Sequence, residues 1–98
     1  MKVSELLTDE TKWCQGAYAR DIHGQEVSYY SLKAVRYCLT GAILQCYQDI
    51  DKGNQVSEAV IGVGEAVIGV IEDDIFTWND ADERTFADIR KLIEDLDI

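Results

Sequence analysis

The stretch SLKAVRYCLTGAILQCYQDI, residues 31–50, carries the clearest helical periodicity in the chain. Its apolar side chains recur at three- and four-residue intervals, which places them on one face of a helix with about 3.6 residues per turn. Ser31 is a residue type that caps helix N-termini, and Gly53 lies just past the other end, where a left-handed C-cap is common. We therefore expect one central helix over residues 31–50. Its core face is expected to consist of Leu32, Val35, Leu39, Ala42, Ile43, Cys46 and Ile50.

The residues before this helix divide into two segments. Residues 2–14 contain two helix-start signals, Ser4 and Thr8, each followed by acidic residues that suit the positive end of a helix. They predict one short or broken helix. Residues 17–30 lose the helical period, hold Gly24 in the middle and are rich in aromatic and β-branched side chains typical of strands. We expect a small hairpin or an irregular segment there.

An internal repeat follows the central segment. The hexapeptide EAVIGV occurs at residues 58–63 and again at residues 65–70. An offset of seven residues is close to two helical turns, so the repeat predicts a largely buried helix. Two short buried strands broken at residues 62–64 remain an alternative, because valine and isoleucine favour strands and glycine disfavours helices. In the helix, we expect Val60, Val63, Val67 and Val70 to be covered and Glu58, Glu65 and Glu72 to be exposed.

The C-terminal segment contains a capping signal and an apolar stripe. Thr85 and Asp88 form a T-x-x-D variant of the capping box, ahead of apolar residues at helical spacing. They predict a terminal helix. Ahead of it, we expect Asn79, Asp80 and Asp82 to form a turn. The sequence as a whole predicts a mainly α-helical single domain over residues 1–98, with four helices and a short hairpin or irregular segment near residues 17–30.

The charge of the chain is strongly negative and uneven. The formal net charge is −10, and residues 72–98 hold ten of the nineteen acidic residues but only three of the nine basic ones. Such a field repels nucleic acid and anionic lipid and attracts basic proteins, although it also serves plain solubility. The apolar run at residues 59–70 is interrupted by Glu65 and falls short of the roughly 20 residues that span a bilayer. We expect neither direct nucleic-acid binding nor a membrane segment.

The cysteines do not predict a redox or metal site. Cys14, Cys38 and Cys46 are odd in number and show no C-x-x-C spacing, and we expect no signal peptide, so a reducing cytoplasm is the expected compartment. Cys14, His23 and Cys38 have no spacing diagnostic of a nucleophile with its base or of metal ligands. We therefore expect no catalytic residue, metal or cofactor, and we expect Cys38 to be buried and unreactive.

Five short blocks resemble the pattern of an uncharacterised bacterial and phage family of small domains, catalogued only as a domain of unknown function. The family pattern is W-x-x-G-A, A-x-D-x-x-G, an aromatic residue with C-x-x-G-A, W-N-D, and R-T before a final helix. The matching blocks here begin at Trp13, Ala19, Tyr37, Trp78 and Arg84. This resemblance leaves the EAVIGV repeat aside. It implies a shared fold and adds no information about activity.

Charged and aromatic residues in these blocks allow two interpretations. An arginine can bind a carboxylate through two parallel hydrogen bonds, so Asp21 or Asp80 can clamp the predicted hairpin to the last turn through Arg84. Alternatively, the blocks converge on an aromatic-walled, polar-floored cleft of the kind that holds small ligands. That possible ligand cleft would consist of Trp13, Tyr18, Asp21, Trp78, Asp80 and Arg84.

The sequence favours a non-enzymatic cytoplasmic interaction module whose acidic C-terminal third binds a basic protein partner. The alternatives are an anti-defence or regulatory protein that imitates DNA phosphates, and a ligand binder or enzyme that uses the cleft. A homodimer through Ile61, Ile68 or Ile71 is also expected, since the repeat has more apolar surface than one small domain covers. The partner-binding carboxylates are expected to repel one another and to have raised pKa values. They are Glu72, Asp73, Asp74, Asp80, Asp82 and Glu83.

Overall fold

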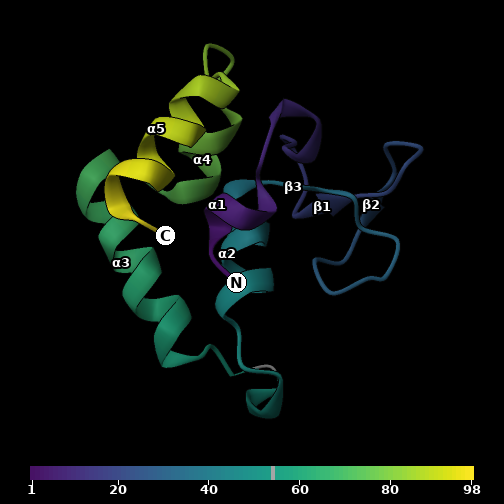
Figure 1. Ribbon diagram of the computed structural model, residues 1–98, viewed down its shortest axis with the longest axis horizontal. Helices are drawn as coiled ribbons and strands as arrows, with labels where there is room; N and C mark the ends of the chain where they lie inside the picture. The colour runs from purple at the N-terminus through teal and green to yellow at the C-terminus, as the bar shows by residue number, and fades with distance from the viewer. Residues whose placement is uncertain (54) are drawn as a thin grey trace.

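Helices make up most of the structure, and a small sheet lies at one side of them (Figure 1). The computed structural model describes residues 1–53 and 55–98, without the side chain of Ile50. Within these residues it has five α-helices, so the mainly helical prediction is confirmed and the number of four is wrong. The elements are α1 (Val3–Leu6), η1 (Glu10–Lys12), β1 (Ala19–Arg20), β2 (Glu26–Val27), β3 (Arg36–Tyr37), α2 (Leu39–Tyr47), η2 (Ile50–Lys52), α3 (Glu58–Ile71), α4 (Ile75–Asp80) and α5 (Phe86–Leu96).

The sheet has three antiparallel strands in the order β2-β1-β3. Strands β1 and β2 form the hairpin expected near residues 17–30, with Arg20 opposite Glu26. The Oδ1 atom of Asp21 closes the turn by accepting hydrogen bonds from the backbone N–H groups of His23 and Gln25. On the other side of β1, Arg20 lies opposite Arg36 of β3. This third strand comes from the segment that the sequence assigned to the central helix.

The central helix is shorter than predicted. Helix α2 begins at Leu39 instead of residue 31, because the backbone groups of Arg36 and Tyr37 pair with β1 and leave the helical conformation. Leu32 and Val35, expected on the core face, are exposed at 104% and 40% of their surface. Their helical spacing is therefore coincidental. A long-range strand pairing outweighs the local pattern.

Both predicted ends of the central helix are also wrong. The Ser31 hydroxyl accepts a hydrogen bond from the N–H of Lys33 within a turn. The true N-cap is Cys38, whose Sγ accepts from the N–H of Gly41 at 3.2 Å. Gly53 has a φ of +57°, but it follows η2 instead of ending α2. The predicted core position of Ile50 lies outside the side chains that the structure describes.

The EAVIGV repeat forms helix α3 as predicted, so the two-strand alternative is wrong. The prediction that this helix is largely buried is wrong, because Val67 is the one residue of α3 that is fully buried. Val60 and Val63 are half-buried and Val70 is 58% exposed, although all four valines were predicted to be covered. A heptad drifts by about 20° on a straight helix, so the second copy of the repeat does not overlie the first. This drift turns Val70 away from the core. Glu58, Glu65 and Glu72 are exposed, as expected.

The last two helices differ in how well the sequence shows them. Helix α5 begins after a complete capping box between Thr85 and Asp88, as predicted. Helix α4 was not predicted, because the run of acidic residues there was assigned to a turn. Its N-cap is Asp74, which accepts a hydrogen bond from the N–H of Thr77. In α4 the aromatic and amide side chains of Trp78 and Asn79 are held by a helix instead of a turn.

The core joins both ends of the chain to α2, α3 and α5. The backbone N–H of Val3 donates to the carbonyl of Ile98, so the two termini lie side by side (Figure 1). The predicted short or broken N-terminal helix is present as α1 and η1, but their N-caps are Lys2 and Asp9 instead of the predicted Ser4 and Thr8. None of the described helices is long and apolar enough to cross a membrane. The largest fully buried side chains are Val3, Leu7, Cys38, Leu39, Val67, Asn79, Ile89 and Ile93.

Candidate functional site

The side chain of Asn79 is the centre of the polar network that joins the family-like blocks. It is completely buried. Its Oδ1 accepts hydrogen bonds from the indole Nε1 of Trp13 at 2.8 Å and from the N–H of Leu39 at 3.0 Å. Its Nδ2 donates to the carbonyl of Cys14 at 3.2 Å and to Oδ1 of Asp80 at 2.8 Å. One amide thus fixes the N-terminal segment, the start of α2 and the end of α4 relative to one another.

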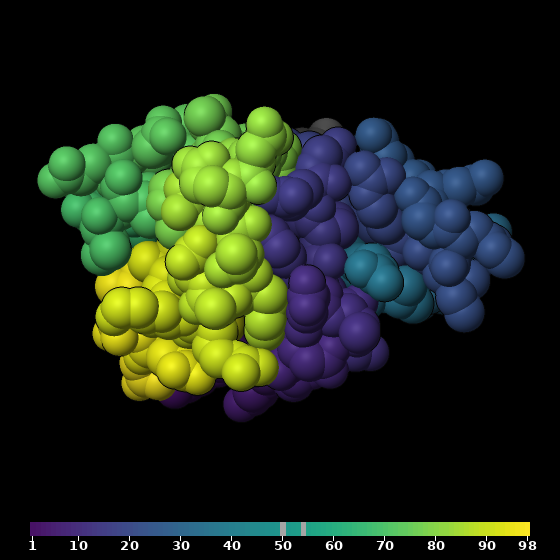
Figure 2. All heavy atoms as spheres, turned by 90° about the horizontal axis from the view of Figure 1, so that it is seen from above, coloured from purple at the N-terminus to yellow at the C-terminus, as the bar shows by residue number. Residues whose placement is uncertain are grey.

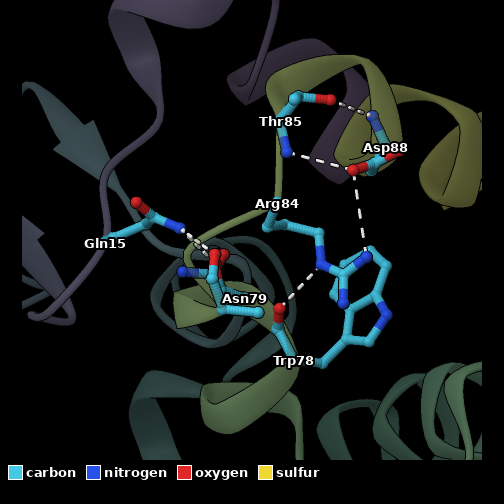
Figure 3. A network of polar contacts seen from close by, with 7 residues as sticks. Gln15, Trp78, Asn79, Arg84, Thr85 and Asp88 are labelled. Atoms are coloured by element: carbon cyan, nitrogen blue, oxygen red, sulfur yellow. Dashed lines mark hydrogen bonds and ion pairs between the residues drawn. The ribbon is translucent and has the colours of Figure 1, made fainter.

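Side chains also satisfy the carbonyl groups around the end of α4 (Figure 3). Such groups have no partner within their own helix. Gln15 Nε2 donates to the carbonyls of Asn79 and Ala81 at 2.9 and 3.1 Å. Arg84 Nε donates to the carbonyl of Trp78 at 2.8 Å, and its guanidinium carbon lies 3.9 Å from the centre of the Trp78 ring. These contacts assign Gln15 and Arg84 to fixing the end of α4.

The expected clamp between Arg84 and Asp21 or Asp80 is not formed. The carboxylate near Arg84 is that of Asp88, at 3.8 Å (Figure 3). Asp21 is engaged in its own hairpin turn, where hydrogen bonds from the Gln25 and His23 amides lower its pKa. Asp80 accepts from the N–H of Gly16 at 3.1 Å and from Asn79. The segment just before the hairpin is therefore attached to α4 by Asp80 without an arginine.

The six residues of the predicted ligand cleft do not line one common hollow. Trp13 lines a hollow of about 600 Å³ beside the sheet. Trp78 and Arg84 line another of about 310 Å³ between α3 and α5. Asp80 lines a third, of about 500 Å³, with Phe76 and Asp82. Tyr18 lies near that third hollow, because its ring packs edge-on against Phe76 with 4.7 Å between ring centres.

The predicted partner-binding carboxylates are mostly exposed. Glu72, Asp73 and Asp74 lie at the connection between α3 and α4, and Asp82 and Glu83 lie at the connection between α4 and α5. Asp80 is half-buried and belongs to the Asn79 network. Asp74 does not show the expected raised pKa. Hydrogen bonds from the Thr77 hydroxyl and backbone N–H lower its pKa instead, because they favour the ionised form.

The cysteines have structural environments. Cys38 is buried as predicted, and burial raises its pKa. Its C-x-x-G spacing has a geometric reason, since a Cβ on Gly41 would lie 2.0 Å from the carbonyl oxygen of Tyr18. Burial also raises the pKa of Cys14 and of Cys46 to about 11. All three thiols are therefore held in the protonated, weakly nucleophilic form at neutral pH.

Sequence reasoning missed the role of Asn79. The W-N-D block containing it and the block beginning at Trp13 were both visible, and their joint presence was the available signal for a contact. The partner atoms were not visible, because the hydrogen bond between Trp13 and Asn79 joins positions 66 residues apart. The pair of half-buried Arg20 and exposed Arg36 was also missed, since only the unpredicted strand β3 brings the two together.

Comparison with known proteins agrees with the resemblance carried by these blocks. No curated protein and no solved structure gave a match to the chain. A family model matches residues 1–96, a range that includes the EAVIGV repeat. Its description is a family of unknown function, DUF6197. Because the match covers nearly the whole chain, this protein belongs to the DUF6197 family.

Proposed function

We propose that this protein is a non-enzymatic cytoplasmic interaction module, which binds a basic segment of a partner protein through an acidic face around α4. This acidic face consists of Glu72, Asp73, Asp74, Asp80, Asp82 and Glu83. The observation that carries the proposal is the hollow of about 500 Å³ lined by Phe76, Thr77, Asp80, Ala81 and Asp82. It combines an aromatic ring with two carboxylates. These groups bind a lysine or arginine side chain through cation–π contact and charge-assisted hydrogen bonds.

The two carboxylates of this hollow have different roles. Asp80 is held in place by Gly16 and Asn79, so its position is fixed before a partner arrives. Asp82 is exposed and, within the described residues, forms no ion pair. It can therefore pair with an incoming cation. A carboxylate fixed beforehand binds at a lower entropic cost than a mobile one.

The exposed carboxylates around the hollow supply long-range attraction. Glu72 and Asp73 precede α4, and Glu83 follows Asp82 after the end of this helix. A single-sign field of this kind speeds the association of a partner of opposite charge and weakens as salt is added. The three free cysteines are compatible with a reducing compartment, which supports the cytoplasm as the proposed location.

The DNA-mimic alternative receives less support from the geometry. A regular row of carboxylates, spaced seven residues apart, consists of Glu58 and Glu65 on α3 and Glu72 at its C-cap. That spacing corresponds to about 10 Å along a helix axis. Duplex DNA carries one negative charge per roughly 1.7 Å of its axis. The row is thus much sparser than the charges it would imitate, and a basic protein segment is the better-supported partner.

The proposal is tested with a fluorescent peptide rich in lysine and arginine, using anisotropy at low and high salt. The double substitution Asp82→Asn and Glu83→Gln should weaken binding by about tenfold. The matched control, Glu58→Gln and Glu65→Gln on α3, removes the same charge and should change the affinity by less than about twofold. Phe76→Leu should weaken binding by removing the aromatic face. Equal losses in the acidic-face variant and its control would refute a specific site.

A further inference from the structure

The segment around the sheet is basic within a strongly acidic protein. Residues 15–37 hold three of the nine basic residues but only two of the nineteen acidic residues, a net charge of +1, so the rest of the chain carries all the net negative charge. We call residues 15–37 the sheet lobe. It projects from the side of the molecule opposite to α3, as the blue atoms in Figure 2 show. Any ligand for this lobe differs in charge from a ligand for the acidic face.

Two arginines lie directly opposite each other in the sheet lobe. Arg20 of β1 and Arg36 of β3 are register partners in the antiparallel pair. Like charges at such positions destabilise a sheet, because their Cβ atoms are only about 5 Å apart. Within the described residues neither arginine forms an ion pair with a carboxylate. Glu26 lies opposite Arg20 on its other side without reaching ion-pair distance. The repulsion is therefore not neutralised inside the protein.

Arg20 is fixed in position by the backbone. Its NH1 donates to the carbonyl of Gly24 at 2.9 Å, and its NH2 donates to the carbonyl of Gln15 at 3.0 Å. Gly16 leaves room for this arrangement, since a Cβ there would lie 3.1 Å from NH2. The guanidinium has more N–H donors than these two carbonyls use. Fixed arginine donors of this kind suit the oxygens of a phosphate or carboxylate group.

Both arginines line the same hollow, which has a volume of about 600 Å³. This volume lies within the range of small-molecule sites, roughly 300–1,000 Å³. His23 lines the hollow as well, with nitrogen atoms able to hydrogen-bond an anion. Ile22 lines it too and offers apolar contact to an organic group. Glu10 contributes a single carboxylate to the lining, against the two arginines.

We infer that this hollow binds a small organic oxyanion, with its phosphate or carboxylate group held between Arg20 and Arg36. The bound anion neutralises the charges of these two arginines, and its organic part lies toward Ile22 and His23. This site is distinct from the acidic face around α4. Because it takes ligands of the opposite charge, a result that refutes the anion site does not affect the proposed binding of a basic partner.

The test compares the wild-type protein with Arg36→Gln and with the control Lys33→Gln. Both positions are exposed and lie in the sheet lobe, and both substitutions remove one positive charge. Melting temperatures are measured in inorganic phosphate, acetate and chloride at matched ionic strength, and phosphate and acetate affinities are measured by titration calorimetry. Arg20 is left unchanged, because its loss would also remove the two hydrogen bonds to backbone carbonyls.

Phosphate or acetate should raise the melting temperature of the wild type and of Lys33→Gln more than chloride does. Arg36→Gln should abolish that rise and weaken the affinity by at least about tenfold. In phosphate-free, low-salt buffer, Arg36→Gln should itself melt above the wild type, since it removes the facing charge. A response to phosphate alone assigns a phosphate ligand, and a response to acetate alone assigns a carboxylate. Equal effects of all three anions, or equal losses in both variants, would overturn the inference.

Discussion

The indole nitrogen of Trp13 and the amide oxygen of Asn79 are joined by a buried hydrogen bond of 2.8 Å across 66 residues of sequence. The same oxygen accepts from the N–H of Leu39. Removing it would leave two buried donors without a partner, and such groups are costly to bury unpaired. The contact therefore determines how the N-terminal segment lies on α2 and α4.

Asn79→Ala is expected to lower the free energy of unfolding by about 2–4 kcal/mol, because the donors of Trp13 and Leu39 lose their acceptor. Urea denaturation followed by circular dichroism measures the change. Gln45→Ala on the exposed side of α2 serves as the control and should change stability by less than about 0.5 kcal/mol. A loss below about 1 kcal/mol for Asn79→Ala would mean that water or another side chain replaces the amide.

Two glycine-to-alanine substitutions should have opposite effects on stability. At Gly41 the added Cβ would meet the carbonyl oxygen of Tyr18 at 2.0 Å, and this backbone atom cannot move aside cheaply. We expect a loss of more than about 2 kcal/mol. At Gly62 in α3 a Cβ would meet nothing within 4 Å, so Gly62→Ala should gain about 0.5–1 kcal/mol from helix propensity. Chemical denaturation measures the change in unfolding free energy of each variant. A stabilising Gly41→Ala would contradict the close contact.

The free energy of unfolding at acidic pH should depend on Asp74. Hydrogen bonds from Thr77 lower the pKa of this carboxylate from its ordinary value of 3.8. Its contribution to stability is therefore present above pH 3.8 and is lost as the pH falls through the lower pKa of the folded state. Asp74→Asn keeps an N-cap residue but removes the charge. It should be less stable than the wild type at neutral pH, with the difference fading at strongly acidic pH.

Denaturation at several pH values measures this effect. Asp82→Asn is the control, since Asp82 has no hydrogen bond or ion pair to another described residue. It should not lower stability at neutral pH. If Asp74→Asn were more stable than the wild type at neutral pH, repulsion among the carboxylates would outweigh the cap, as the sequence alone had suggested.

The predicted homodimer remains open to test on α3. Ile61 and Ile68 are each 48% exposed, whereas Ile71 is half-buried against the core. We expect concentration-dependent association in sedimentation velocity, and Ile68→Glu should abolish it by placing a charge in the contact. Leu32→Glu, an equally drastic change at an exposed site outside α3, should leave it intact. A wild-type protein that stays monomeric at all concentrations would exclude the dimer.

The cysteines should label in the order of their exposure. Cys46 is half-buried and Cys38 is fully buried, and burial raises both pKa values. Near neutral pH, a maleimide reagent should modify Cys46 slowly and Cys38 only after unfolding. Mass spectrometry of digested samples at several reaction times measures both rates. Cys38 labelling as fast as Cys46 would show that the start of α2 opens readily.

The elements predicted correctly are those determined by local signals. Helix α5 has a capping box and an apolar stripe within its own sequence, and α3 has a strongly apolar repeat. The segment at residues 31–38 was predicted wrongly, because its helical spacing competes with strand pairing to β1. The two proposed sites depend on neighbours that the sequence does not show. Phe76 and Arg36 gain their neighbours from the tertiary fold, and no pattern within a single segment shows which hollow they line.

The meeting of the two chain ends has a consequence for engineering. Val3 and Ile98 share a backbone hydrogen bond, and Lys2 forms an ion pair with Asp97 at 2.6 Å. A short linker can therefore join the ends without distorting α1 or α5. New ends can be opened at the exposed turn around Leu32, as circular permutation is tolerated at exposed loop tips. A permuted chain would place a fused reporter on the sheet lobe and leave the acidic face free.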